Sequence, residues 1–116
     1  MTGPTGSHRF MVELARTAAE QQRGMMFRRS LAPDRGMLFP FAAPEEATFW
    51  MENTLIPLDL LFIRADGSIA NIAANAKPMD RSLLPSEGMV SAVLELAGGR
   101  AAQLGIRPGD RVEWRH

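Results

Sequence analysis

The chain has 116 residues, of which 46% are hydrophobic and 22% are charged, a composition typical of one globular domain. The 13 basic residues balance the 13 acidic residues, so the chain lacks the basic excess of a nucleic-acid-binding protein and no nucleic-acid partner is expected. There is no cysteine, which excludes disulfides, thiol nucleophiles and cysteine-held metal clusters. No apolar stretch approaches the roughly 20 residues of a membrane span, so no transmembrane segment is expected.

The first elements follow a Gly-, Pro-, Ser- and Thr-rich opening. Residues 1–8 predict a flexible lead, and residues 9–116 are expected to form a single globular domain. Apolar and polar residues alternate over 9–15, which predicts a half-buried strand. Thr17 followed by Glu20 matches a capping box, so a helix is expected to begin there and to run on to about residue 29.

Four strands are expected in the middle of the chain. Short strands at 36–41 and 47–52 are separated by a predicted turn at 43–46, and a loop follows at 53–57. Residues 58–63, "LDLLFI", form a nearly continuous apolar run that predicts a strand buried on both faces. The Asp66-Gly67 pair indicates a hairpin turn, and residues 69–74 are the expected partner strand.

The last part contains the longest expected loop, 75–88, which has two prolines and no periodicity. A strand at 90–96, a short helix ending at Gly105 and a final strand within 106–114 are expected to follow. The fold class predicted from these six or seven short strands and two short helices is mainly β (α+β). We expect a compact single-domain β-sandwich or partly open barrel.

Several kinds of catalytic site are excluded by the residues that are missing. The two histidines, His8 and His116, lie near the chain ends, so a Ser-His-Asp triad lacks its base and a hydrolytic zinc site lacks its usual ligands. There is no tyrosine and no phosphate-binding glycine loop. Carboxylates, the single lysine Lys77, hydroxyls and arginines remain, and we expect no metal and no cofactor.

Asp59 is unusual because it lies inside the apolar strand 58–63. An unpaired buried carboxylate is very unfavourable, so Asp59 must be paired, hydrogen-bonded or at the edge of a cleft. One interpretation is a structural clamp that accepts from Arg23, Arg28 or loop amides and holds the turn before the strand. The other is a cleft carboxylate with a shifted pKa that acts as acid, base or ligand anchor.

The segment before Asp59 combines an indole, an amide and a hydroxyl. Asn53 and Thr54 suit a tight turn before Pro57, because Asn tolerates left-handed geometry and Thr caps turns. Alternatively they form one lip of a cleft, since an aromatic beside hydrogen-bonding groups is typical of sites for sugar rings and similar ligands. The expected ligand-binding residues are Arg28, Trp50, Met51, Asn53, Thr54 and Asp59.

The eight methionines suggest another binding chemistry. Thioethers bind Cu(I), and Met25, Met26, Met37 and Met51 lie within otherwise distinctive stretches of the sequence. No repeated spacing of a copper-binding cluster is present, and methionine more often fills irregular gaps in a core. Core packing is therefore the simpler expectation.

The ordered segments "RGMMFR", "GMLFPF", "FWMENTLIPLDLLFI", "DGSI" and a closing "GIRPGD" resemble the domain of unknown function 192 (DUF192) family of small prokaryotic proteins. The resemblance covers about residues 10 to 115. It implies a compact, mainly β fold and frequent export, and it implies no established activity. The family usually has lysine where this chain has Glu52, so Glu52 is not expected to be a site residue.

Three classes of function follow from these observations. The first is a small binding domain, periplasmic or exported with its leader absent from this sequence, for a small or sugar-like ligand or an envelope protein; the cytoplasm is the alternative location. The second is a hydrolase-like enzyme that uses Asp59 with a second carboxylate such as Glu95, which is expected on the polar face of its strand. The third is a structural module without a ligand.

Overall fold

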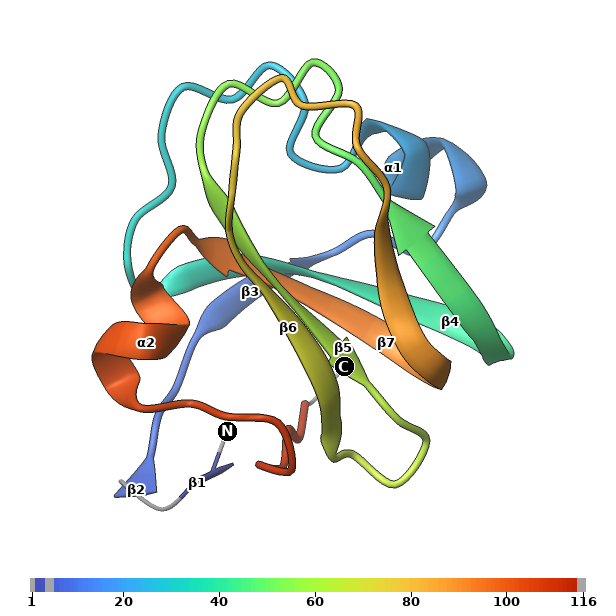
Figure 1. Ribbon diagram of the computed structural model, residues 1–116, viewed down its shortest axis with the longest axis vertical. Helices are drawn as coiled ribbons and strands as arrows, with labels where there is room; N and C mark the ends of the chain where they lie inside the picture. The colour runs from blue at the N-terminus through green and yellow to red at the C-terminus, as the bar shows by residue number, and fades with distance from the viewer. Residues whose placement is uncertain (1, 4–5, 115–116) are drawn as a thin grey trace.

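The computed structural model describes residues 2–3 and 6–114, and most of its regular structure is β-strand (Figure 1). The strands are β1 (Thr2–Gly3), β2 (Gly6–Ser7), β3 (Met11–Leu14), β4 (Arg35–Phe49), β5 (Leu58–Ile63), β6 (Ile69–Ala76) and β7 (Leu84–Ala97). The helices are α1 (Ala18–Arg23) and α2 (Arg100–Leu104). In the described part of the chain, neither helix is long enough to cross a bilayer.

Five of the strands form one mixed sheet in the order β3-β4-β7-β5-β6, and β1 pairs with β2 separately. The edge strands β3 and β6 do not pair with each other, so the sheet is open. β3 runs parallel to β4, with α1 in the connection between them, and the other neighbours are antiparallel. The expected mainly β fold with two short helices is confirmed. The division into a lead, 1–8, and a domain, 9–116, stays a prediction, and His116 lies outside the described residues.

The expected strand at 58–63 is confirmed as β5, which lies between β6 and β7. All six of its residues are buried, as its continuous apolar run predicts for a strand covered on both faces. The hairpin to β6 turns at Gly67, whose φ of 89° suits glycine, and the expected Asp66-Gly67 turn is confirmed.

The turn expected at 43–46 was wrong, because β4 runs through it as one long strand. β4 pairs with β7 from Gly36↔Leu96 to Phe49↔Leu84, and the register shifts between Pro40 and Glu45. Extra residues in one strand of a pair form a bulge, which bends the strand and accommodates a proline that lacks an N–H. The chain therefore bends here without reversing, and two expected short strands are one.

The capping box that predicts the start of α1 is confirmed. Thr17 Oγ1 accepts from the Glu20 amide at 3.0 Å, and Glu20 Oε1 accepts from the Thr17 amide at 2.9 Å. The expected continuation to residue 29 was wrong, because the helix ends at Gly24 with a φ of 47°. A Cβ at Gly24 would lie 3.2 Å from the Phe39 ring, so the close packing of this turn on β4 also favours glycine.

The segments after β6 also differ from expectation. The loop expected at 75–88 spans 77–83, because β6 and β7 extend into it from both sides. α2 ends at Gly105 as expected, in a left-handed conformation. The final strand expected within 106–114 is reduced to one bridge, Ser68↔Arg111, although the segment bonds closely to the start of β6.

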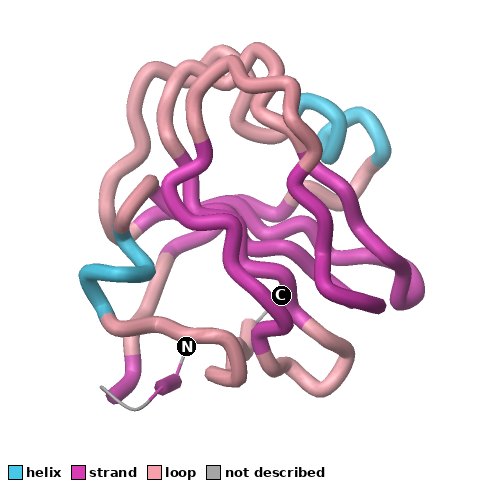
Figure 2. The backbone as a smooth tube through the Cα atoms, viewed as in Figure 1, coloured by secondary structure: helices cyan, strands magenta, loops and turns pink. Residues whose placement is uncertain are grey.

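A hydrophobic core covers each face of the sheet. The α1-side core includes Phe39, Met51 and Phe62, and the α2-side core includes Leu61 and Leu96. Figure 2 shows that the loops 24–34, 50–57 and 77–83 gather at the end of the molecule beside α1, whereas the two termini lie toward the other end. We call this the loop end.

Candidate functional site

Asp59 is fully buried and is held by three backbone amides. Its Oδ1 accepts from the amide of Asn75 at 2.7 Å and from that of Gly99 at 2.9 Å, and its Oδ2 accepts from the amide of Ala101 at 2.8 Å. Gly99 is the N-cap residue of α2 and has no side chain with which to cap it. Asp59 therefore supplies the missing cap from β5 and ties α2 and the end of β6 to the sheet.

Arg28 was considered as a partner of Asp59, and this was wrong. The Arg28 guanidinium pairs instead with both carboxylate oxygens of Glu13 on the edge strand β3. Backbone amides stabilise the Asp59 carboxylate in place of a positively charged side chain, since two or three amide donors can satisfy a buried carboxylate. Asp59 thus has the bonding expected of the structural clamp.

Three other expected ligand-binding residues, from the segment before Asp59, lie at the loop end. Asn53 adopts φ 56°, the left-handed conformation expected of it, and its carbonyl accepts from the Phe27 amide at 2.8 Å. Thr54 is buried, and its carbonyl accepts from the Met79 amide at 2.9 Å. Met51 belongs to the α1-side core. Asn53 thus bonds the loop 50–57 to the loop 24–34, and Thr54 bonds it to the loop 77–83. Together with Met51 in the core, they hold the three loops together.

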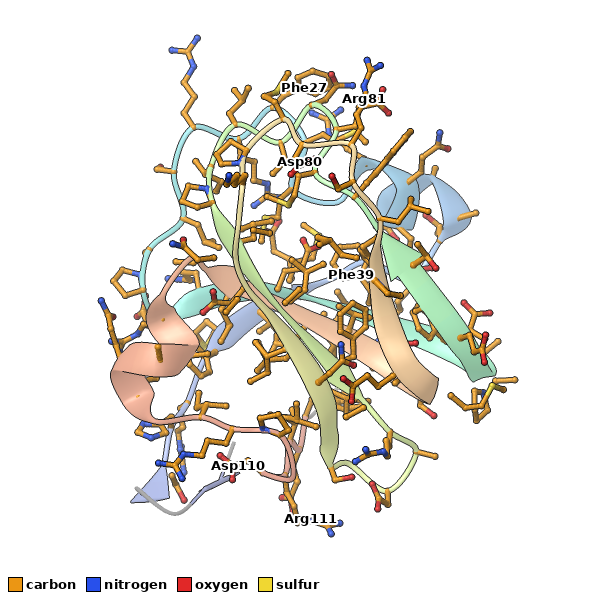
Figure 3. The ribbon with its side chains drawn as sticks, viewed as in Figure 1. Phe27, Phe39, Asp80, Arg81, Asp110 and Arg111 are labelled. Carbon is orange, nitrogen blue, oxygen red and sulfur yellow. The ribbon has the colours of Figure 1, made fainter. Side chains whose placement is uncertain are left out.

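A pocket of about 350 Å³ lies between α1, β4 and the start of the loop 50–57, and we call it the α1 pocket. Of the expected ligand-binding residues, Trp50 and Thr54 line it, whereas Arg28, Met51, Asn53 and Asp59 do not. Phe39, labelled in Figure 3, contributes its ring from β4. The full lining consists of Gln21, Gln22, Arg23, Gly24, Met25, Met26, Phe39, Phe41, Glu45, Glu46, Ala47, Thr48, Phe49, Trp50, Glu52, Thr54 and Glu95.

Glu95 is the buried acid of this pocket. It lies on β7 opposite Met37 of β4 and Leu60 of β5, so its side chain leaves the sheet on the α1 side among apolar neighbours. The residue is 5% exposed, and its Oε1 atom is buried without a hydrogen-bond partner. Burial raises the pKa of Glu95 to about 8, so the carboxyl is mostly protonated at neutral pH.

The expected acid pair does not meet in one cleft. Across β5 and β7, Asp59 lies opposite Leu96, which belongs to the α2-side core, whereas Glu95 lies opposite Leu60, which belongs to the α1-side core. Directly opposed residues share a face of a sheet, so the two carboxyl groups leave on opposite faces. They cannot act together on one bound substrate.

Sequence analysis placed Glu95 on a polar strand face, and this was wrong. Both faces of β7 are buried from Ala92 to Leu96. The signal was present in the sequence, because Val93, Leu94 and Leu96 surround Glu95 with the same continuous apolar pattern that marks β5. The contribution of α1 to the pocket has no signal in local sequence and depends on tertiary packing.

The methionines considered as copper ligands lie mainly in the core. Met25, Met37 and Met51 are buried in the α1-side core, and Met26 is half-buried at the α1 pocket. Within residues 2–3 and 6–114, no group of three or more His, Cys, Asp and Glu side chains is arranged to hold a metal ion. Gap filling accounts for the buried methionines.

Comparisons with known proteins give the family and no established activity. The model of the DUF192 family, described as "Uncharacterized ACR", matches residues 1–114. A crystal structure of a protein of unknown function from Novosphingobium aromaticivorans DSM 12444 is 56% identical, with a TM-score of 0.96 over 97% of this chain and 81% of that one. A Sinorhizobium meliloti 1021 protein, provisionally described as a transcription regulator, is 44% identical, with a TM-score of 0.91 over 95% of this chain and 86% of that one. No curated protein matches the chain.

Proposed function

The chain belongs to the DUF192 family, and from that premise we propose that it is a small ligand-binding domain that holds a small organic molecule in the α1 pocket. The observation that supports this most directly is Glu95, which lines the pocket and whose buried Oε1 has no hydrogen-bond partner. Buried polar groups are nearly always bonded, and a polar group left unpaired beside a cavity is typical of a site that a ligand completes.

The walls of the pocket support the same proposal. The lining combines aromatic rings, among them Phe39, Phe49 and Trp50, with a few polar groups, among them Thr54. Ligand sites are typically concave, mostly apolar and equipped with a small number of polar groups that orient the ligand. A volume of about 350 Å³ lies at the small end of such sites and suits a ligand of metabolite size.

A binding screen with paired variants tests this proposal. Trp50→Ala removes an exposed wall of the pocket, and Met89→Ala removes a similarly exposed apolar side chain of β7 that does not line it. Wild type and both variants would be screened by ligand-observed NMR against neutral, sugar-like, cationic and anionic small molecules. We expect at least one ligand whose binding is lost in Trp50→Ala and kept in Met89→Ala. A screen in which no ligand binds, or in which both variants bind alike, would reject the pocket as the site.

We also propose that the protein works in the cell envelope, because the resemblance to the DUF192 family implies frequent export. Fractionation of native cells followed by immunodetection tests this location. Recovery in the periplasmic or membrane-associated fraction is expected, and recovery in the cytosol would reject the proposed location.

The description of the Sinorhizobium relative as a regulator of transcription is not proposed for this chain. Its equal numbers of acidic and basic residues give little electrostatic attraction to DNA.

A second candidate, docking of a partner protein, is favoured by the exposed apolar side chains at the loop end. Phe27 and Met79 are 58% and 54% exposed, and both adopt a φ of 65°, which is strained for a bulky residue. Figure 3 shows both Phe27 and Arg81 at this end of the molecule. Self-association is the first partner to test, by sedimentation of the wild type and of a Phe27→Ser, Met79→Ser variant. A concentration-dependent dimer that the variant loses supports docking of a second copy, and a monomer in both excludes it.

A further inference from the structure

The α1 pocket contains more acidic than basic side chains. The acidic lining residues are Glu45 and Glu46 of β4, Glu52 of the loop 50–57 and Glu95 of β7, whereas Arg23 is the one cation among the lining residues. Glu46 pairs with the exposed Met89 and Glu45 with the buried Val90, so the Glu46 side chain leaves β4 on the face away from the α1-side core. Glu52 is already paired with Arg81 at 3.4 Å. With that pair set aside, Glu45 is matched by Arg23, and Glu95 is mostly protonated at neutral pH, so the pocket becomes net negative when Glu95 ionises. A concave site with that charge attracts cations and repels anions.

Aromatic side chains form much of the remaining wall. Phe39 and Phe49 meet edge to face with ring centroids 5.3 Å apart, and Phe41 and Trp50 also line the pocket. The faces of aromatic rings carry partial negative charge, so they stabilise a cation placed over them, with Trp the strongest. Trp50 is 44% exposed, and the aromatic pairs among the described residues do not include it.

Glu95 is the group that such a cation would complete. Its Oε1 has no donor, and its strand neighbours Met37 and Leu60 are apolar and can supply none. An alkylammonium or guanidinium carries several N–H donors and a positive charge, and a charge-assisted hydrogen bond is stronger than a neutral one. A carboxylate or phosphate ligand would instead bring a second acid toward Glu95.

We propose that the α1 pocket binds a small organic cation, a primary ammonium or guanidinium group on a short apolar skeleton, with its charged head on Glu95 and its skeleton on the aromatic wall. This inference rests on the proposed function and narrows it to one ligand class. The volume of about 350 Å³ leaves room for a ring or a chain of a few carbons beside the charged head.

Binding of such a cation is coupled to release of one proton. Burial raises the pKa of Glu95 to about 8, so below that pH the carboxyl must ionise before it can pair with the cation. The other charged residues that line the pocket are Arg23 of α1, Glu45 and Glu46 of β4, and Glu52. Affinity therefore rises by up to roughly tenfold per pH unit between about pH 6 and 8.

Isothermal titration calorimetry with three matched probes tests the inference. Phenethylammonium, phenethyl alcohol and hydrocinnamate share a ring and a short chain and differ in the charge of the head. Each would be titrated at about pH 6, 7 and 8, in buffers of different ionisation enthalpy, so that the number of released protons is measured. The proteins are the wild type, Glu95→Gln and Glu87→Gln. The last makes the same chemical change at an exposed position of the same strand.

We expect the ammonium to bind the wild type and Glu87→Gln at least about tenfold more tightly than the alcohol, with hydrocinnamate weakest. Glu95→Gln should weaken the ammonium by at least about tenfold and abolish both the pH dependence and the proton release. Equal affinity for the alcohol and the ammonium, or an unchanged affinity in Glu95→Gln, would overturn the cation inference.

The outcomes separate the two proposals. If the alcohol or hydrocinnamate binds and loses its affinity in Trp50→Ala while the ammonium does not bind, the ligand-binding function stands and the cation class is wrong. If none of the probes binds and the wider screen also finds no ligand, both proposals fall. Because glutamine keeps the size of the side chain and its hydrogen-bonding capacity, circular dichroism should show that Glu95→Gln is folded.

Discussion

The protonation of Glu95 in the folded protein predicts an unusual dependence of stability on pH. Burial raises the pKa of Glu95 from the usual 4.5 to about 8 because nothing in the described structure bonds its Oε1. In the unfolded chain the carboxyl ionises near its usual pKa. Between these two values the folded state binds a proton that the unfolded state does not, so stability falls as pH rises.

The size of the effect follows from the shift. The stabilisation is fully present below about pH 4.5 and is lost as the pH rises toward 8, and it amounts to at most roughly 5 kcal/mol in total. Several other carboxyl groups have lowered pKa values, so the stability that they contribute is lost in acid, below about pH 4.5 and outside this window. They are Glu13, Glu20, Asp66 and Asp80.

Urea denaturation of the wild type, Glu95→Gln and Glu87→Gln from about pH 5 to 8.5 measures this dependence. The wild type and Glu87→Gln should lose stability steadily, whereas Glu95→Gln should be nearly flat and, by pH 8.5, at least as stable as the wild type. A flat profile for the wild type, or one slope shared by all three proteins, would mean that Glu95 is ionised in the folded state. The account of an unpaired buried acid would then be wrong.

Three further substitutions test the packing. Asp59→Asn removes the acceptor for one of the three amides and should lower the free energy of unfolding by about 3 kcal/mol. The expected fall in Tm is on the order of 10 °C, and the exposed control Asp34→Asn should not share it. Equal Tm values for the two variants would contradict the structural clamp. Thr17→Ala should cost about 1 kcal/mol in urea denaturation through loss of the capping box, and no change would argue that α1 needs no cap. Gly36→Ala places a Cβ 2.6 Å from the Glu95 carbonyl and should cost about 2 kcal/mol or more, whereas a variant that melts like the wild type would show that the backbone yields there.

Local patterns in the sequence identify the central elements of this fold. The apolar run of β5, the Asp66-Gly67 turn and the capping box at Thr17 each depend on neighbouring residues, and each is confirmed. The errors arise where tertiary contacts override local signals. The prolines around residues 40–44 suggest a turn, yet pairing with β7 keeps β4 continuous through a bulge. Parallel pairing of β3 with β4 is a long-range contact that no local pattern specifies.

The candidate site was predicted in part. Trp50 and Thr54 were expected at a cleft and line the α1 pocket, whereas Asp59, the residue that prompted the expectation, lies on the opposite face of the sheet. The sequence shows that a carboxylate is buried but does not show which groups bond it. The backbone amides that hold Asp59 come from Asn75, Gly99 and Ala101, and only the folded chain brings these residues together.

Asp59 and Glu95 lie in adjacent central strands, one residue apart in register, and differ sharply in how they are satisfied. Asp59 accepts three amide hydrogen bonds, so its removal would break contacts between elements and its presence is explained by the fold alone. Glu95 Oε1 accepts none, so an apolar side chain of similar size would suit its surroundings better. An acid that the fold leaves unbonded, beside the α1 pocket, is the group that the proposed ligand would bond. The contrast directs experiments to Glu95 for function and to Asp59 for stability.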